Sequence, residues 1–151
     1  MTAPPPTPLV IEQRIRARPE TLFAYFTDPE AYRRWMGDTA ELEPWPGGRY
    51  RVRFEDGSVA EGVYEAVEPP TRVVFTWGWR DSEDLPPGST RVEVTLRPEG
   101  DETVVRLEHH GLPGEAWRGE HEKGWQRYLG QLAGAQDMQE GHDADAQAHR
   151  G

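Results

Sequence analysis

The chain has 151 residues and no cysteine, and this absence excludes two classes of protein. Without cysteine there is no disulfide framework of the kind that stabilises small secreted domains, and there is no thiolate nucleophile. No apolar run approaches the roughly 20 residues that a membrane-spanning helix needs. The segment Met1 to Pro8 has neither the basic nor the apolar region of a secretory signal. We therefore expect a cytoplasmic protein.

Basic residues are few as well, with 17 Lys and Arg against 27 Asp and Glu, which gives a formal net charge of -10. This charge opposes binding to phosphate backbones and to anionic lipid. The sequence also lacks a Gly-x-Ser-x-Gly elbow and a glycine-rich phosphate loop that leads into a helix. Nucleic acid, membranes, nucleotides and acyl-enzyme chemistry are therefore not predicted, and we expect no cofactor and no metal site.

The ends differ in composition from the middle. Residues 1–8 are rich in proline and predict an extended or disordered lead, while 134–151 have Met138 as their only large apolar side chain and predict a solvated, acidic tail. The apolar content of 35% is enough for one core. We expect a single folded domain over 9–133.

Apolar and polar residues alternate through most of this domain, as expected of half-buried strands. For example, Tyr50, Val52 and Phe54 alternate with arginines. Short turn-rich links join neighbouring runs, so the sheet is predicted to be antiparallel and sequential. The first strand is followed by two short helical patterns, over 19–28 and 29–36. The predicted strands are 9–17, 40–45, 49–55, 59–67, 72–79, 90–97 and 103–110.

The last predicted element is a helix over 115–133 with one apolar face. At 100° per residue, one arc of about 120° collects these six residues: Trp117, His121, Trp125, Tyr128, Leu129 and Leu132. Such a face has to be buried, and the concave side of the sheet is the available partner.

Several short motifs occur in a specific order: Trp35, Gly-Gly-Arg-Tyr at 47–50, Pro69-Pro70, His-x-Gly-Leu at 109–112 and Gly124-Trp125. Together they resemble the SRPBCC (START-like) superfamily, and most closely its AHSA-type branch, named for the activator of the heat-shock chaperone ATPase. The resemblance implies an α+β helix-grip fold. In this fold a curved antiparallel sheet of about seven strands, with two short helices after the first, encloses an apolar pocket under a long C-terminal helix. Members bind lipids, sterols, polyketides or other apolar molecules, and some catalyse cyclisation or hydrolysis without a cofactor.

Aromatic side chains are the main candidates for a binding site. Wide rings offer apolar area, so an aromatic-walled pocket suits ring-bearing or lipid-like ligands. His121 lies within the aromatic arc and can serve as a polar contact or as a general base. It can equally be a core histidine that is hydrogen-bonded to the sheet. The predicted ligand-binding residues are Trp35, Trp77, His109, Trp117, His121, Trp125 and Tyr128.

For the predicted strand 59–67, the sequence does not show which face is buried. Glu61 and Glu65 share one phase, while Ala60, Gly62 and Tyr64 share the other. Periodicity does not decide between them, and the simpler interpretation puts the two carboxylates on the solvated face. The arginines at 49, 51 and 53 are interpreted in the same way, as partners of acids on neighbouring strands.

We predict from these observations a protein, monomeric or homodimeric, that binds a small hydrophobic molecule without turning it over. One alternative is a cofactor-free cyclase, aromatase or hydrolase with His121 as base and Tyr128 as proton donor. A second alternative is a chaperone-associated stress-response protein that acts through its surface.

Overall fold

The computed structural model describes residues 7–150, with side chains described for 7–136. The elements follow one another as predicted: β1 (Leu9–Ile15), α1 (Pro19–Ala24), α2 (Pro29–Arg33), β2 (Thr39–Leu42), β3 (Arg49–Arg53), β4 (Val59–Glu68), β5 (Arg72–Trp77), β6 (Thr90–Glu99), β7 (Glu102–His110) and α3 (Gly114–Arg150). Within the described residues, no helix combines the length and the apolar character needed to cross a bilayer.

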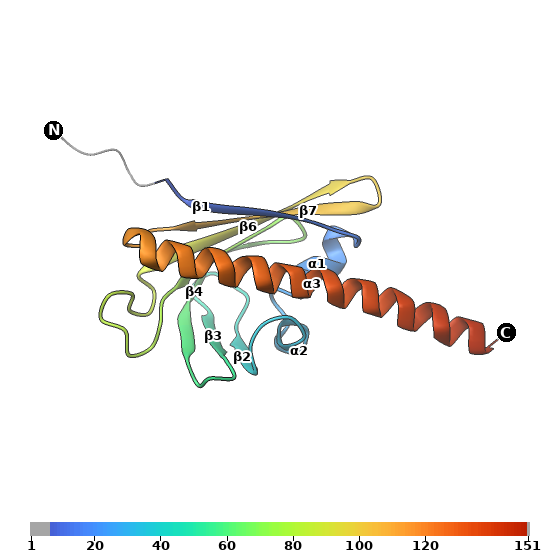
Figure 1. Ribbon diagram of the computed structural model, residues 1–151, viewed down its shortest axis with the longest axis horizontal. Coiled ribbons are helices and arrows are strands. Elements are labelled where there is room, and N and C mark those ends of the chain that lie inside the picture. The colour runs from blue at the N-terminus through green and yellow to red at the C-terminus, as the bar shows by residue number, and fades with distance from the viewer. Residues whose placement is uncertain (1–6, 151) are drawn as a thin grey trace.

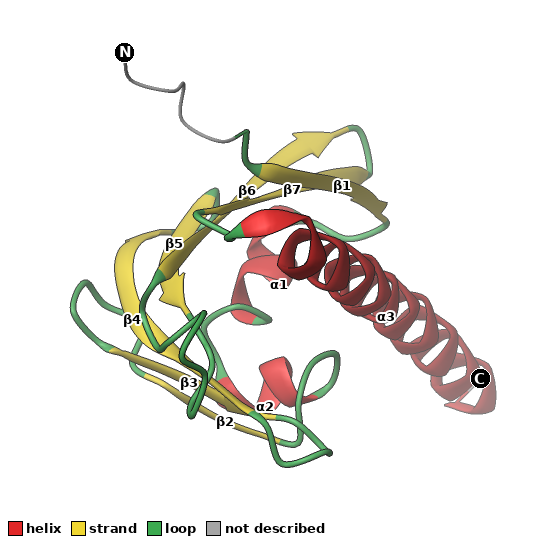
Figure 2. Ribbon diagram, turned by 60° about the vertical axis from the view of Figure 1, so that its left-hand side comes forward, coloured by secondary structure: helices red, strands yellow, loops and turns green. Residues whose placement is uncertain are grey.

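A single sheet of seven antiparallel strands forms the body, in the order β1-β7-β6-β5-β4-β3-β2. Strands β2 to β7 are neighbours in chain order, whereas β1 crosses over to pair with β7, with Leu9 opposite His109. The sheet curves around α3, and α1 and α2 lie inside the same curve (Figures 1 and 2). The predicted helix-grip fold of the α+β class is confirmed.

The two short helices begin where their sequences indicate. Pro19 and Pro29 each occupy the first helical turn, where the missing N–H of proline costs nothing. The Asp28 side chain accepts a hydrogen bond from the backbone N–H of Glu30 at 3.1 Å, which caps α2. This helix ends just before Trp35 and Met36, which are both 1% exposed. The short helices therefore supply buried aromatic and apolar side chains to the inside of the curve.

The core beneath these helices is aromatic. Tyr50 stacks on Phe75 with ring centroids 4.1 Å apart, and its hydroxyl bonds to that of Tyr32. The hydroxyl of Tyr64 donates to the carbonyl of Phe26 at 2.8 Å. Each buried hydroxyl thus has a partner, as burial requires.

The structure settles which face of β4 is buried. Ala60 and Tyr64 are fully buried, while Glu61 points outward and pairs with Arg80 at 2.6 Å. Gly62 passes so close to β5 that an added Cβ would lie 1.9 Å from the Thr76 carbonyl oxygen. The carboxylates therefore lie on the outer face, in agreement with the simpler interpretation.

Helix α3 is longer than predicted. The sequence predicted an end near Ala133, but the helix continues to Arg150 and projects beyond the sheet (Figure 1). Gln136 is only 4% exposed, so packing extends at least one turn further than expected. Of the predicted lead, residues 1–6 lie outside the described residues, as does residue 151. Arg118 donates to the carbonyl of Thr7 at 2.6 Å, which ties the start of β1 to α3.

Candidate ligand-binding site

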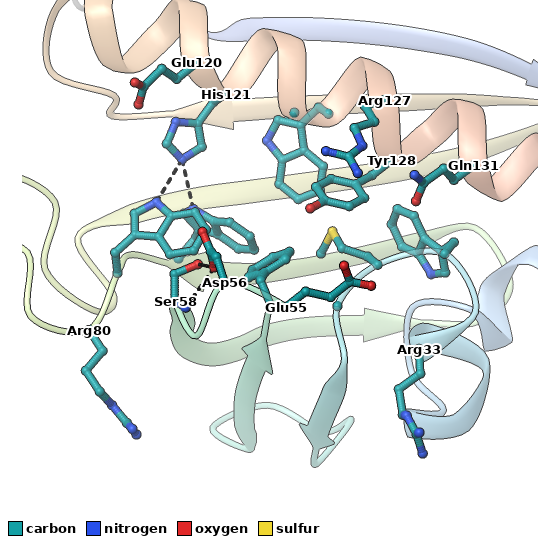
Figure 3. Close-up of a pocket in the computed structure, with 18 of the residues that line it drawn as sticks. Arg33, Glu55, Asp56, Ser58, Arg80, Glu120, His121, Arg127, Tyr128 and Gln131 are labelled. Carbon is teal, nitrogen blue, oxygen red and sulfur yellow. Dashed lines mark hydrogen bonds between the residues drawn. The ribbon is translucent and has the colours of Figure 1, made fainter.

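A cavity of about 760 Å³ lies between α3 and the inner side of the sheet (Figure 3). Four segments line it: α3, the end of α2 with the link that follows, the β3–β4 turn, and the end of β5. The lining residues are Arg33, Arg34, Trp35, Met36, Gly37, Phe54, Glu55, Asp56, Ser58, Trp77, Trp79, Arg80, Trp117, Glu120, His121, Gly124, Trp125, Arg127, Tyr128 and Gln131.

Burial distinguishes two parts of this lining, with the half-buried Gly37, Ser58, Trp79, Trp117, Gly124 and Tyr128 between them. We call the buried residues the floor: Trp35, Met36, Phe54, Trp77, His121 and Trp125. We call the exposed residues the rim: Arg33, Arg34, Glu55, Asp56, Arg80, Glu120, Arg127 and Gln131. The floor is thus almost entirely aromatic or aliphatic, whereas the rim carries charges of both signs.

His121 projects from α3 onto two indole rings of the sheet (Figure 3). Its Nε2 accepts hydrogen bonds from the Nε1–H groups of Trp77 and Trp79, both at 3.2 Å. Its Nδ1 lies 2.9 Å from the Trp117 carbonyl oxygen, so the ring proton lies on Nδ1 and is donated to that carbonyl. Burial lowers the pKa of His121 and favours this neutral form.

His109 lies behind the floor, 1% exposed, and continues the same network. Its Nδ1 accepts from the indole N–H of Trp125 at 3.0 Å, so the proton of the neutral ring lies on Nε2 and is donated to Thr90 Oγ1 at 2.8 Å. The Thr90 hydroxyl in turn donates to the Trp77 carbonyl at 2.8 Å. Burial, and then the neighbouring His121, lower the pKa of His109 well below its ordinary value.

These contacts limit what the site can do chemically. The only ring nitrogen of His121 with a lone pair already accepts two indole protons, so a base that takes a proton from a ligand is not available there. The Tyr128 hydroxyl is protonated at neutral pH and can donate a hydrogen bond, and burial raises its pKa further. The neutral His121 ring therefore offers the cavity no free imidazole lone pair.

The structure brings most of the predicted site residues together. Trp35, Trp77, Trp117, His121, Trp125 and Tyr128 all line the cavity. His109 is not among the lining residues, and its ring lies 6.1 Å from those of Trp77 and Trp125, so its role in ligand binding stays a prediction.

Several lining residues were missed by the sequence analysis. Phe54 shares the phase of Tyr50 and Val52, and this alternation was a usable signal for its inward side chain. Trp79 follows Trp77 at strand spacing and also lines the cavity. No sequence pattern distinguished the charged residues of the rim from other surface charges.

A metal could be held elsewhere. Among residues 7–136, the potential ligand atoms of Glu93, Glu108 and His110 lie within 4.8 Å of one another. These residues lie on the outer face of β6 and β7, and Arg72 already contacts Glu93 at 2.6 Å. The cavity itself therefore offers no comparable group of ligands in the described residues.

Solved structures share this architecture. The chain is similar to protein MLL2253 from Mesorhizobium loti, with a TM-score of 0.78 and 25% identity over 87% of this chain and 97% of that one. It is also similar to DynU16, a protein in the dynemicin biosynthetic locus (TM-score 0.76, 23% identity, 88% of this chain and 48% of that one). A third structure is the HSP90 activator PFC0360w from Plasmodium falciparum (TM-score 0.68, 22% identity, 84% and 94%).

The two less identical structures show a common fold and nothing further. No curated protein matches the chain significantly. The family model described as activator of Hsp90 ATPase homolog 1-like protein matches residues 16–136, which are most of the folded domain. With the helix-grip fold established, this match shows that the chain belongs to the activator of Hsp90 ATPase homolog 1-like family, the AHSA-type branch of the SRPBCC superfamily.

Proposed function

We propose that this protein binds a small, ring-bearing apolar molecule in the cavity between α3 and the sheet. The observation that carries the proposal is the floor: a volume of about 760 Å³, within the usual range for small-molecule sites, is walled by buried aromatic and aliphatic side chains. Indole rings provide broad flat surfaces against which a planar ligand can stack. The chemistry of the walls thus selects for shape and apolar area.

The contacts of His121 favour binding over turnover. A cofactor-free cyclase, aromatase or hydrolase would need this imidazole to accept a proton from the ligand. Both of its nitrogens are engaged with the protein, one by two indole donors and the other by a helix carbonyl. These contacts support a structural role for His121.

Two glycines of α3 offer a matched pair of variants for a test. An added Cβ at Gly124 or at Gly130 meets no atom within 4 Å, but only Gly124 lines the cavity. Glycine is a poorer helix former than alanine by about 0.8–1 kcal/mol and leucine ranks just below alanine, so neither substitution should weaken the helix. Gly124→Leu fills part of the cavity, whereas Gly130→Leu places the same side chain on the exposed surface.

The experiment is a thermal-shift screen of aromatic and lipid-like compounds, together with native mass spectrometry of gently purified protein. We expect the wild type and Gly130→Leu to bind the same compound with equal affinity, and Gly124→Leu to bind it at least about tenfold more weakly, about 1.4 kcal/mol. Equal affinity in Gly124→Leu would show that the compound binds elsewhere. A wild type that retains no adduct and responds to no compound would refute the proposal.

The family match favours a second candidate, contact with an Hsp90-type chaperone. Such a contact would use the outer surface of the domain rather than the cavity. We expect any stimulation of a purified Hsp90 ATPase to be the same with the wild type and with Gly124→Leu. Stimulation that disappears in Gly124→Leu would link the chaperone role to the cavity, and no stimulation by the wild type would remove this candidate.

A further inference from the structure

We infer that the ligand of this cavity is amphipathic, with one polar end: an apolar ring body lies on the floor and a hydrogen-bond acceptor stays at the rim. His121 acts as a positioning residue. It accepts hydrogen bonds from the indole N–H groups of Trp77 and Trp79, which would otherwise be free to bind an acceptor of the ligand. The inference rests on the proposed function and narrows it to a class of ligand.

The floor has no free hydrogen-bonding group. Its side chains with polar atoms are Trp35, Trp77, His121 and Trp125. The indole N–H of Trp35 donates to the Tyr25 carbonyl at 2.8 Å. The N–H groups of Trp77 and Trp125 donate to His121 and His109, respectively, and both nitrogens of His121 are engaged. Every polar side-chain atom of the floor therefore has a partner within the protein.

Placing a polar group of the ligand on the floor costs free energy of desolvation. A carbonyl moved from water onto this floor loses its water hydrogen bonds and gains none, and an unsatisfied buried group of this kind is strongly disfavoured. Apolar ring atoms suffer no such loss. The floor therefore excludes ligands that carry an acceptor at their inner end.

The rim, in contrast, can donate hydrogen bonds to a polar group of the ligand. Arg127 and Gln131 are exposed at the mouth, and the half-buried Tyr128 lies between them and the floor. All three project from α3 over the mouth, with Glu55 on the opposite side (Figure 3). Guanidinium, amide and phenol groups all donate hydrogen bonds, so an acceptor at the outer end of the ligand has several partners.

His121 is the residue that controls this selectivity. Two of the indole donors, those of Trp77 and Trp79, converge on its Nε2 at 3.2 Å. His121→Leu would remove that acceptor and leave two N–H groups free beside the cavity. His121→Gln is the matched control, because a glutamine side-chain carbonyl can replace Nε2 as the acceptor.

The test uses two neutral naphthalenes of nearly equal size, 2-acetyl-6-isopropylnaphthalene and 2,6-diacetylnaphthalene. The first has an acceptor at one end only, and the second has one at both ends. Their affinities are measured by tryptophan fluorescence quenching and by calorimetry. In the wild type and in His121→Gln we expect the first compound to bind at least about tenfold more tightly. In His121→Leu we expect the ratio to fall below about threefold, because the second acetyl group gains indole donors.

The outcomes separate this inference from the proposed function. Equal affinity of the two compounds for the wild type would overturn the inference and leave the proposed function intact. Failure of the wild type to bind either compound, or the fully apolar 2-isopropylnaphthalene, would contradict both. The wild-type ratio requires no variant, so it decides the question even where His121→Leu does not fold. An unchanged ratio in a folded His121→Leu would show that His121 does not set the selectivity.

Discussion

At the scale of single residues, the two buried histidines adopt opposite tautomers. His109 carries its proton on Nε2 because an indole N–H faces its Nδ1, whereas His121 carries its proton on Nδ1 because a helix carbonyl faces that atom. Their ring centroids are 5.1 Å apart, and the neighbouring His121 further disfavours a charge on His109. A second proton on either ring would point an N–H group at an indole N–H group. The network is therefore complete only when both rings are neutral.

This arrangement predicts that the protein becomes less stable as the pH falls. Burial lowers the pKa of both histidines in the folded state, so below about pH 6.5 the unfolded chain binds protons that the folded chain does not. Stability therefore rises with pH in this window. Between pH 7.5 and pH 5.5 we expect a loss of up to about 1.4 kcal/mol for each histidine that stays neutral in the folded state. Urea unfolding at the two pH values measures this change.

Two variants assign that loss to particular residues. His109→Leu cannot be protonated, so its stability should change less with pH, although it should be less stable at pH 7.5 because Trp125 and Thr90 lose their partner. His110→Gln is the control, since His110 is half-buried on the outer face of the sheet. A pH dependence in His109→Leu as steep as in the wild type would show that His109 is not a source of the effect.

At the scale of elements, alternation along the chain predicted where the strands lie but not which way β4 faces. One phase of this strand alternates three valines with the two glutamates, and the other holds Tyr64 among small residues. The decision comes from packing, because Gly62 lets β4 approach β5 and Tyr64 packs edge-on against Phe75 inside the curve. Val63 remains 43% exposed. The alternation of residues along β4 therefore does not show by itself which face of the strand is buried.

For helix α3, the sequence predicted which residues form the buried face but not which residues of the sheet they contact. Its apolar arc was predictable because helical geometry places those residues on one face, and Trp125, Leu129 and Leu132 are all buried. The partners of that face were not predictable. The bond between Trp77 and His121 joins residues 44 positions apart, and it exists only because β5 and α3 meet in the fold.

At the scale of the whole molecule, stability depends on how far the helix is held against the sheet. Leu129 and Leu132 are completely buried in the core. Gln136, at the end of the described side chains, is also buried. Beyond it, residues 137–151 contain Met138 as their only large apolar residue. Helical turns that gain no packing are marginal in water. The folded core should therefore end close to Gln136, although the helix itself continues.

Two truncations test this boundary. A chain that ends after Gln136 should unfold in urea within about 1 kcal/mol of the full-length protein and should keep the same ligand affinity, because the cavity lining ends at Gln131. A chain that ends after Tyr128 loses Leu129 and Leu132, and deleting buried leucines costs about 2–5 kcal/mol each. Since that sum is comparable to the 5–15 kcal/mol that stabilises a typical domain, the shorter chain should not fold. A loss of more than about 2 kcal/mol in the first truncation would show instead that residues after Gln136 pack against the domain, and the solvated tail predicted from the sequence would be wrong.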